Sequence, residues 1–527
     1  MNKKKEVKEV IRKPRFLKRN VIIILSLLLL ALSLFLFQIH RGKKQDYISD
    51  EPSSDSYAQG KALTLKHCQS CHMLPDPGLL DKEAWKKLLP EMGLTLGIQS
   101  PQLKIPEEDR SFYPAHPAMN AAEWQSILNY YRAVAPASLP LQNKTGVPQQ
   151  GSSFFAPLLP PETLFRSNTR VTCVRMDNSV KPGRLFVYDV ASHQLFLFNQ
   201  HGLMDSIYTD DAIVDIRFYN NEIFACSIGN ELIIGTSANK FGKVFPITVS
   251  NSGKLQIKPA LFESLARPVQ VVPTDINGDG QTDFLLCEFG SLRGSLSWME
   301  NNGAGRYQQH IIRKKPGSVN VYVKQNKQTK RNDLWALFAQ GEEGIFHFIS
   351  KEDGTFDVTQ VLRFPPTYGS TSFEMVDINK DGFEDIIYTC GDNGDITTIL
   401  KPYHGVYVFT NDGNNNFQQK FFYPMHGCYK VMARDFLHTG NIDLAAIAYF
   451  TDPDRPEPFV FLKNDGNLHF TPHGAPKEIN FEKVLTMDAG DFNADGKQDI
   501  IIGNALMDGD ATVKGSPFAI LANTGNK

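Results

Sequence analysis

The longest apolar stretch of the chain is residues 21–37, where only Ser26 and Ser33 interrupt Val, Ile, Leu, Ala and Phe. As a helix with the next two residues it would span about 28 Å, close to the thickness of a bilayer core. Nine Lys/Arg residues precede this stretch and three follow it closely. The pattern predicts a cytoplasmic basic tail and transmembrane anchor over residues 1–40. A cleaved signal peptide is the alternative, although no small-x-small cleavage site follows Phe37.

Beyond residue 165 the apolar positions form short strand-length runs that are separated by polar turns. The runs recur in units of roughly 50 residues, and each later unit carries a second aromatic strand that ends at an Asn/Asp-Gly turn. Such repeating β units are typical of a β-propeller. The units start near Asp177, Asp215, Asp275, Gln325, Asp377, Asp435 and Asp491. Because the last unit lacks an outer strand, we expect residues 154–165 to supply it.

Between these two patterns lies a segment that predicts helices. Asn120 and Glu123 have capping-box spacing, and the helix after them would bury Ile127, Leu128 and Tyr131. A shorter helix is expected over residues 81–89. The sequence therefore predicts a linker over 41–55, a small all-α domain over 56–137, a Pro-rich connector over 138–164 and a propeller over 165–527.

Composition and charge narrow the function. The 527 residues are 42% hydrophobic and 21% charged, which is typical of globular protein. The net charge of -2 conceals a basic N-terminus and an acidic remainder. An acidic body argues against nucleic acid as a partner, since phosphate binding needs clustered cations.

One motif carries specific chemistry: Cys68, Cys71 and His72 form C-x-x-C-H. Two thiols at this spacing can form thioethers with haem vinyl groups, and the adjacent His can ligate the iron. A thioredoxin-like redox pair or half of a zinc site is the alternative. No second C-x-x-C occurs in the sequence, and no βαβ pattern surrounds this one. The motif therefore predicts one haem c.

Residues 56–137 resemble a small monohaem cytochrome c domain, with Gly60 in the first helix and the last helix before Pro136. The resemblance implies that these two helices cross and that the sixth iron ligand is a methionine. Met92 is the favoured ligand and Met119, just before the last helix, is the alternative. Met73 adjoins the proximal His and cannot reach the other haem face.

Three loops of the repeat region share the pattern D-x-N-x-D-G-x-x-D and run directly into a buried strand. Oxygens at positions 1, 3, 5 and 9 can surround one hard cation, and Gly at position 6 permits the reversal. A structural turn rich in Asp and Gly is the alternative. The sequence predicts about three Ca²⁺ sites, with the ligands Asp275, Asn277, Asp279, Asp283, Asp377, Asn379, Asp381, Asp385, Asp491, Asn493, Asp495 and Asp499.

With these loops and their aromatic tails, residues 165–527 resemble the FG-GAP or VCBS-type repeat family. The resemblance implies a seven-bladed β-propeller with calcium in the loops at the blade edges. The loop from Asp435 has Leu437 and Thr439 in ligand positions, so it is not expected to bind metal.

Two further features remain open. An insertion with Tyr403 and His404, followed by His426 in the next unit, suggests either a polar pocket or ordinary loop packing. Five cysteines lie outside the haem motif, of which Cys390 and Cys428 are the nearest pair for a disulfide: Cys173, Cys226, Cys287, Cys390 and Cys428.

The expected fold class is multidomain, with a transmembrane helix, an all-α cytochrome c domain and an all-β seven-bladed propeller. The expected function is electron transfer by a c-type cytochrome at the inner membrane, with its haem and propeller on the periplasmic side. It would act as a carrier rather than an enzyme, pass electrons to or from a redox partner protein, and use the propeller for docking or for a glycan or small molecule. The alternatives are an oxidoreductase whose propeller oxidises an organic substrate, and a surface-binding module.

Overall fold

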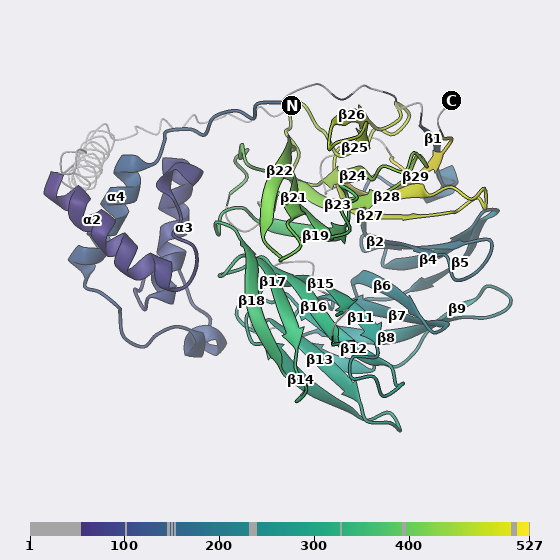
Figure 1. Ribbon diagram of the computed structural model, residues 1–527, viewed down its shortest axis with the longest axis horizontal. Helices are drawn as coiled ribbons and strands as arrows, with labels where there is room; N and C mark the ends of the chain where they lie inside the picture. The colour runs from purple at the N-terminus through teal and green to yellow at the C-terminus, as the bar shows by residue number, and fades with distance from the viewer. Residues whose placement is uncertain are drawn as a thin grey trace, which may run out of the picture. The chain divides into compact units, whose positions relative to one another are not determined.

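The computed structural model describes residues 54–100, 103–144, 148, 151, 154–230, 240–326, 329–392, 397–506 and 514–525. Ser56–Lys527 form one compact unit. In that unit, short helices come first and antiparallel strands make up most of the rest, as the change from purple to yellow in Figure 1 shows.

The predicted fold class is wrong. The protein is mostly β, with a propeller-like all-β fold. Its short helices do not form a separate all-α cytochrome domain, because they belong to the same compact unit as the strands. The predicted transmembrane stretch, residues 21–37, lies outside the described residues. Among the helices that the structure describes, none has both the length and the apolar character needed to cross a bilayer.

The described strands form seven four-stranded antiparallel blades, and a bridge from β2 to β28 joins blades 1 and 7 into one sheet. A short hairpin strand, β9 (Leu255–Ile257), extends blade 2. The strands are given from the inner to the outer strand of each blade: blade 1 has β2 (Thr169–Asp177), β3 (Arg184–Asp189), β4 (Gln194–Asn199) and β5 (Gly202–Tyr208), and blade 2 has β6 (Ile213–Tyr219), β7 (Glu222–Ser227), β8 (Gly242–Val249) and β10 (Phe262–Leu265). Blade 3 has β11 (Pro268–Thr274), β12 (Asp283–Glu288), β13 (Ser295–Asn301) and β14 (Tyr307–Arg313), blade 4 has β15 (Ser318–Gln325), β16 (Asn332–Phe338), β17 (Gly344–Ser350) and β18 (Phe356–Arg363), and blade 5 has β19 (Ser370–Val376), β20 (Asp385–Cys390), β21 (Gly405–Asn411) and β22 (Phe417–Pro424). Blade 6 has β23 (Cys428–Arg434), β24 (Asp443–Ala448), β25 (Phe459–Asn464) and β26 (Phe470–Gly474), and blade 7 has β27 (Val484–Gly490), β28 (Asp499–Leu506), β29 (Phe518–Asn523) and β1 (Phe155–Leu158).

The blades form a closed ring. Each inner strand contacts the inner strand of the next blade, and β27 contacts β2. In Figure 1 the inner strands lie nearest the ring centre, and their labels follow it in chain order. Strand β1 pairs antiparallel with β29, so the prediction that residues 154–165 supply the missing outer strand is confirmed. Second strands such as β12 and β20 are buried along their whole length, because they are covered on both faces by neighbouring blades.

A belt of polar side chains links successive inner strands. In six blades the inner strand contains a β-bulge. The side chain of the residue directly after this bulge forms a hydrogen bond with the main chain of the next blade. The pairs are Asp215 with the amide of Val271, Gln270 with the amide of Val321, Asn320 with the carbonyl of Phe373, Ser372 with the amide of Val431, Lys430 with the carbonyl of Met487, and Thr486 with the amide of Val174. The belt explains why polar residues occur in otherwise apolar inner strands.

One expected unit start is wrong. Asp215 lies inside β6, where it accepts hydrogen bonds from Arg175 and Arg217, instead of opening a ligand loop. Strands β6 and β7 are joined by the two-residue turn Asn220-Asn221, and both residues have positive φ. Such a turn closes a hairpin without room for a nine-residue loop.

The described α-helices are α2 (Ser54–His67), α3 (Lys82–Thr95) and α4 (Ala121–Val134). The predicted capping box of α4 is present, since Asn120 and Glu123 bond to each other's backbone amides. Helix α3 was expected to end at residue 89 but continues through Pro90. Its buried face, which includes Trp85 and Leu88, packs against α4.

Candidate functional site

The C-x-x-C-H motif lies directly after helix α2. Cys68 opens a 3₁₀ turn, η1 (Cys68–Ser70), and the Ser70 hydroxyl closes it by donating to the His67 carbonyl at 2.7 Å. Cys68 is half-buried and Cys71 is exposed, and both thiols are free. The turn therefore presents two thiols, three residues apart, at the C-terminal end of a helix.

The environment of Cys68 disfavours thiolate chemistry. Burial, with a smaller effect of Cys71, raises the pKa of the Cys68 thiol to about 11. A redox thiol or a zinc ligand acts as a thiolate and normally has a lowered pKa. Within the described ranges, moreover, no three His, Cys, Asp or Glu side chains are placed to hold a metal ion. The raised pKa of Cys68 therefore argues against the alternatives of a redox pair and a zinc site.

His72 is held in one tautomer. Its Nδ1 lies 2.8 Å from the Met73 carbonyl oxygen, and because a carbonyl only accepts, Nδ1 carries the proton. Burial lowers the pKa of His72 despite the opposing effect of this hydrogen bond, so the ring is neutral at pH 7. Nε2 therefore keeps a lone pair, which is the state in which His ligates a metal.

Both predicted methionines lie against one apolar cluster. Met119 is 7% exposed and belongs to the cluster with Ile127 and Tyr131. Met92, on α3, is partly buried and packs against the same cluster. The structure thus brings both candidate ligands to one cluster, which surrounds the meeting point of α3 and α4.

Helices α2 and α4 approach each other closely at Gly60. A Cβ at Gly60 would lie 2.1 Å from the Ser126 carbonyl oxygen and 2.8 Å from Tyr130 Cβ. Only glycine permits this approach, so the approach depends on a single residue.

Three aromatic side chains fix the backbone after the motif. The Tyr131 hydroxyl donates to the Pro75 carbonyl at 2.8 Å, and Trp85 Nε1 donates to the Pro77 carbonyl at 2.8 Å. From blade 5, the Tyr403 hydroxyl donates to the Leu79 carbonyl at 3.0 Å. The motif segment is therefore anchored both to its own helices and to a blade.

The three predicted calcium loops lie between the first and second strands of blades 3, 5 and 7. In the loop of blade 3, Asp275 accepts hydrogen bonds from the amides of residues 278, 279 and 280. Asp283 is fully buried and accepts from the amides of Ile276 and Asn301. The ninth-position residues of the other loops, Asp385 and Asp499, bond in the same way. These carboxylates thus close the loops through main-chain amides.

The degenerate loop of blade 6 closes in the same way. Asp435 accepts from the amides of Thr439 and Gly440, although Leu437 and Thr439 replace the third and fifth ligands. In blade 1, Arg184 donates a hydrogen bond to Asp177 at 2.8 Å, so the positive charge beside this aspartate comes from the protein itself. The loop geometry therefore does not require a cation.

Burial raises the pKa of all three ninth-position aspartates, and the nearby loop carboxylates raise it further. For Asp499 the pKa reaches about 6. A cation in the loop would oppose this shift, because it favours the ionised carboxylate. The loops contain oxygen donors of the type that a hard cation prefers, but the described residues place no three of their carboxylates to hold a metal ion, and the loops are closed by main-chain amides.

The predicted pocket of Tyr403, His404 and His426 is formed only in part. The His404 side chain is 0% exposed, and burial together with Lys401 and His426 lowers its pKa. Tyr403 stacks on Tyr368 with ring centroids 4.6 Å apart. Of the three, His426 lines a pocket that also contains Ile399 and Phe450.

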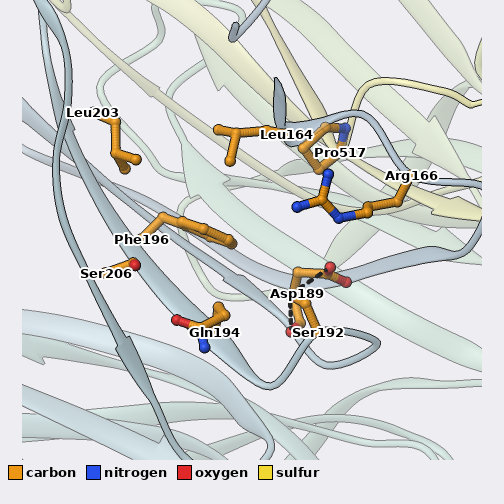
Figure 2. A pocket seen from close by; sticks show the side chains of 9 residues that line it. All are labelled: Leu164, Arg166, Asp189, Ser192, Gln194, Phe196, Leu203, Ser206 and Pro517. Atoms are coloured by element: carbon orange, nitrogen blue, oxygen red, sulfur yellow. Dashed lines mark hydrogen bonds between the residues drawn. The ribbon is translucent and has the colours of Figure 1, made fainter. Parts of the chain in front are cut away.

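A second pocket, of about 370 Å³, lies beside blade 1. Figure 2 shows Arg166 and Asp189 on one side and Phe196 and Leu203 on the other. Asp189 is already engaged by the amide of Arg170 and by the Ser192 hydroxyl, whose bond is dashed in the figure. No local sequence pattern predicts this pocket, because it joins residues from both ends of the repeat region.

The five remaining cysteines are buried and free, so Cys390 and Cys428 form no disulfide. Burial raises the pKa of both thiols. They act as small apolar residues in the blade cores.

No protein-family model matches the chain, and no curated protein matches it. Among solved structures, virginiamycin B lyase from Staphylococcus aureus is similar over 70% of this chain and 98% of its own, with 12% identity and a TM-score of 0.43. BBS1N, solved in complex with ARL6DN, is similar over 71% of this chain and 99% of its own, with 10% identity and a TM-score of 0.40. The gluconolactonase XC5397 from Xanthomonas campestris covers 60% of this chain and 97% of its own, with 13% identity and a TM-score of 0.34. These likenesses concern the all-β, propeller-like fold alone.

Proposed function

We propose that this protein is a c-type cytochrome that transfers single electrons through one covalently attached haem. The observation that carries the proposal is the donor set of the motif. Two free thiols lie three residues apart, and next to them His72 is neutral and directs its proton to the Met73 carbonyl. The raised pKa of Cys68 disfavours the alternative thiolate roles. The residues present therefore fit a haem c.

Each residue has a distinct role in this proposal. Cys68 and Cys71 would hold the haem as thioethers, and His72 would be the proximal axial ligand. Met92 is the proposed distal ligand, with Met119 as the alternative, and both lie against the apolar cluster. A bound haem supplies a reversible one-electron change at its iron. The Met73 carbonyl holds the proton of His72 at Nδ1.

The test is expression of the full chain in a host that attaches c-type haem. We expect covalent haem that survives denaturing electrophoresis, and its loss in a Cys68→Ala, Cys71→Ala double variant. Reduced-minus-oxidised and near-infrared spectra of Met92→Leu and Met119→Leu should show which change removes the methionine–iron band. Colourless protein from a competent host would refute the proposal. A methionine–iron band that persists in both variants would refute the ligand assignment alone.

Calcium and location belong to the same proposal. We propose that about three Ca²⁺ ions bind the complete loops, because each loop contains a buried carboxylate whose pKa is raised further by neighbouring loop carboxylates, and a bound cation would relieve this repulsion. The ring of blades would then serve as a stable docking surface for a redox partner protein. Since c-type haem is attached outside the cytoplasm, we propose a periplasmic location for the haem segment and the blades.

A further inference from the structure

A pocket of about 580 Å³ lies where the connector meets blades 5 and 6. This volume is typical of small-molecule sites, which range over about 300–1,000 Å³. The pocket wall is mainly apolar and comes from segments that are far apart in sequence, including Leu139, Pro140, Ile399, Leu400 and Phe450.

One of the residues that line this pocket is a buried histidine. The His426 side chain is 8% exposed, and its Nδ1 is buried without a hydrogen-bond partner among the described residues. Buried polar groups in native proteins are nearly always paired, so an orphaned ring nitrogen needs an explanation. Burial, with a smaller effect of Lys144, lowers the pKa of His426 to about 4, so the ring is neutral at pH 7. A neutral imidazole can accept a bond from a hydroxyl or donate one to a carbonyl.

The charges around the pocket balance. Asp81 and Lys483 both line it and have opposite signs. Asp81 is also engaged, because it accepts a hydrogen bond from the Ala84 amide at 2.8 Å as the cap of α3. The lining residues thus include one acidic and one basic side chain, so the pocket has no net charge and this favours a neutral molecule.

We propose that this pocket binds a small, neutral, mainly apolar ring compound whose hydroxyl or carbonyl group hydrogen-bonds to His426. The apolar wall would cover the ring, and the imidazole would fix its orientation. This inference does not depend on haem, so its test is independent of the test of the proposed function.

The experiment uses 2-naphthol as the probe and follows its fluorescence as the full-length protein is added. We expect saturable binding that weakens at least tenfold in His426→Phe, which keeps a ring but removes both nitrogens. Leu400→Trp should block binding by filling the pocket. His473→Phe is the matched control: His473 is also 8% exposed with an orphaned ring nitrogen, yet it does not line this pocket, so its loss should leave binding unchanged.

Circular dichroism of each variant checks that the blades remain folded. Absence of saturable binding to the unaltered protein would overturn the proposal. Equal binding by a folded His426→Phe and the unaltered protein would overturn it as well. If His426→Phe does not fold, Leu400→Trp decides: a folded Leu400→Trp that still binds 2-naphthol rejects the pocket as the site.

Discussion

The loop aspartates make stability depend on pH in the direction opposite to that of an ion-paired carboxylate. Burial, with the nearby Asp495 and Asp491, raises the pKa of Asp499 from 3.8 to about 6. Asp499 is 0% exposed, so water screens little of this effect. Between these two pH values the folded state keeps a proton that the unfolded chain has released. Its contribution is therefore complete below pH 4 and is lost as the pH rises through 6.

The size of the effect follows from the shift. About two pKa units correspond to about 3 kcal/mol of unfolding free energy. We expect the difference in unfolding free energy between the unaltered protein and Asp499→Asn to fall by about this amount from pH 4 to pH 7.5. Urea unfolding in the presence of a chelator measures the difference. A difference that stays constant or grows over this range would falsify the reasoning.

The effect of Ca²⁺ on stability gives a second test, for which the loop of Asp443 is the matched control. Burial also raises the pKa of Asp443 to about 6, but its loop has Leu437 and Thr439 in ligand positions. Saturating Ca²⁺ at pH 7 should therefore raise stability through the Asp499 loop and leave the contribution of Asp443 unchanged. Asp495→Ala should reduce the calcium response, whereas Thr439→Ala should not. Equal responses of these two variants would contradict a calcium role for the loop.

Three further predictions concern packing. Gly60→Ala should destabilise the helices by about 1–3 kcal/mol, since the clash with the Ser126 carbonyl outweighs the gain in helix propensity; thermal unfolding measures this, and an unchanged melting temperature contradicts it. Tyr403→Phe removes a hydrogen bond to the motif segment, so amide exchange at Asp76, Gly78 and Leu79 should become faster; exchange that stays as slow contradicts the link. Phe155→Ala should cost about 3 kcal/mol because Phe155 is buried against Phe461, and urea unfolding that shows a cost below about 1 kcal/mol would argue against closure by β1.

Local pattern was enough to predict several elements. The capping box at Asn120 and the buried strand after Asp283 involve residues close in sequence, so spacing alone revealed them. The closure by β1 followed from counting, because the last unit was one strand short. In each case the signal was a repeat or a short-range rule.

Other features depend on tertiary contacts that no local pattern encodes. Helix α3 passes through Pro90 because its buried face, including Trp85, packs against α4 on both sides of that residue. Asp215 was expected at the start of a repeat unit, but it lies inside β6, where Arg175 and Arg217 donate hydrogen bonds to it. The polar belt was missed for the same reason, since each bond joins residues about 50 positions apart or more.

The loops show that one motif can hold two separable roles. Positions 1 and 9 close the turn through main-chain amides, and they do so equally in the complete loop of Asp491 and in the loop of Asp435. The two loops differ at positions 3 and 5, where Leu437 and Thr439 replace Asn493 and Asp495. Folding of the blade should therefore follow positions 1 and 9, whereas affinity for a cation should follow positions 3 and 5. A motif match that includes all four positions predicts the turn first, and the metal only as far as positions 3 and 5 provide oxygen.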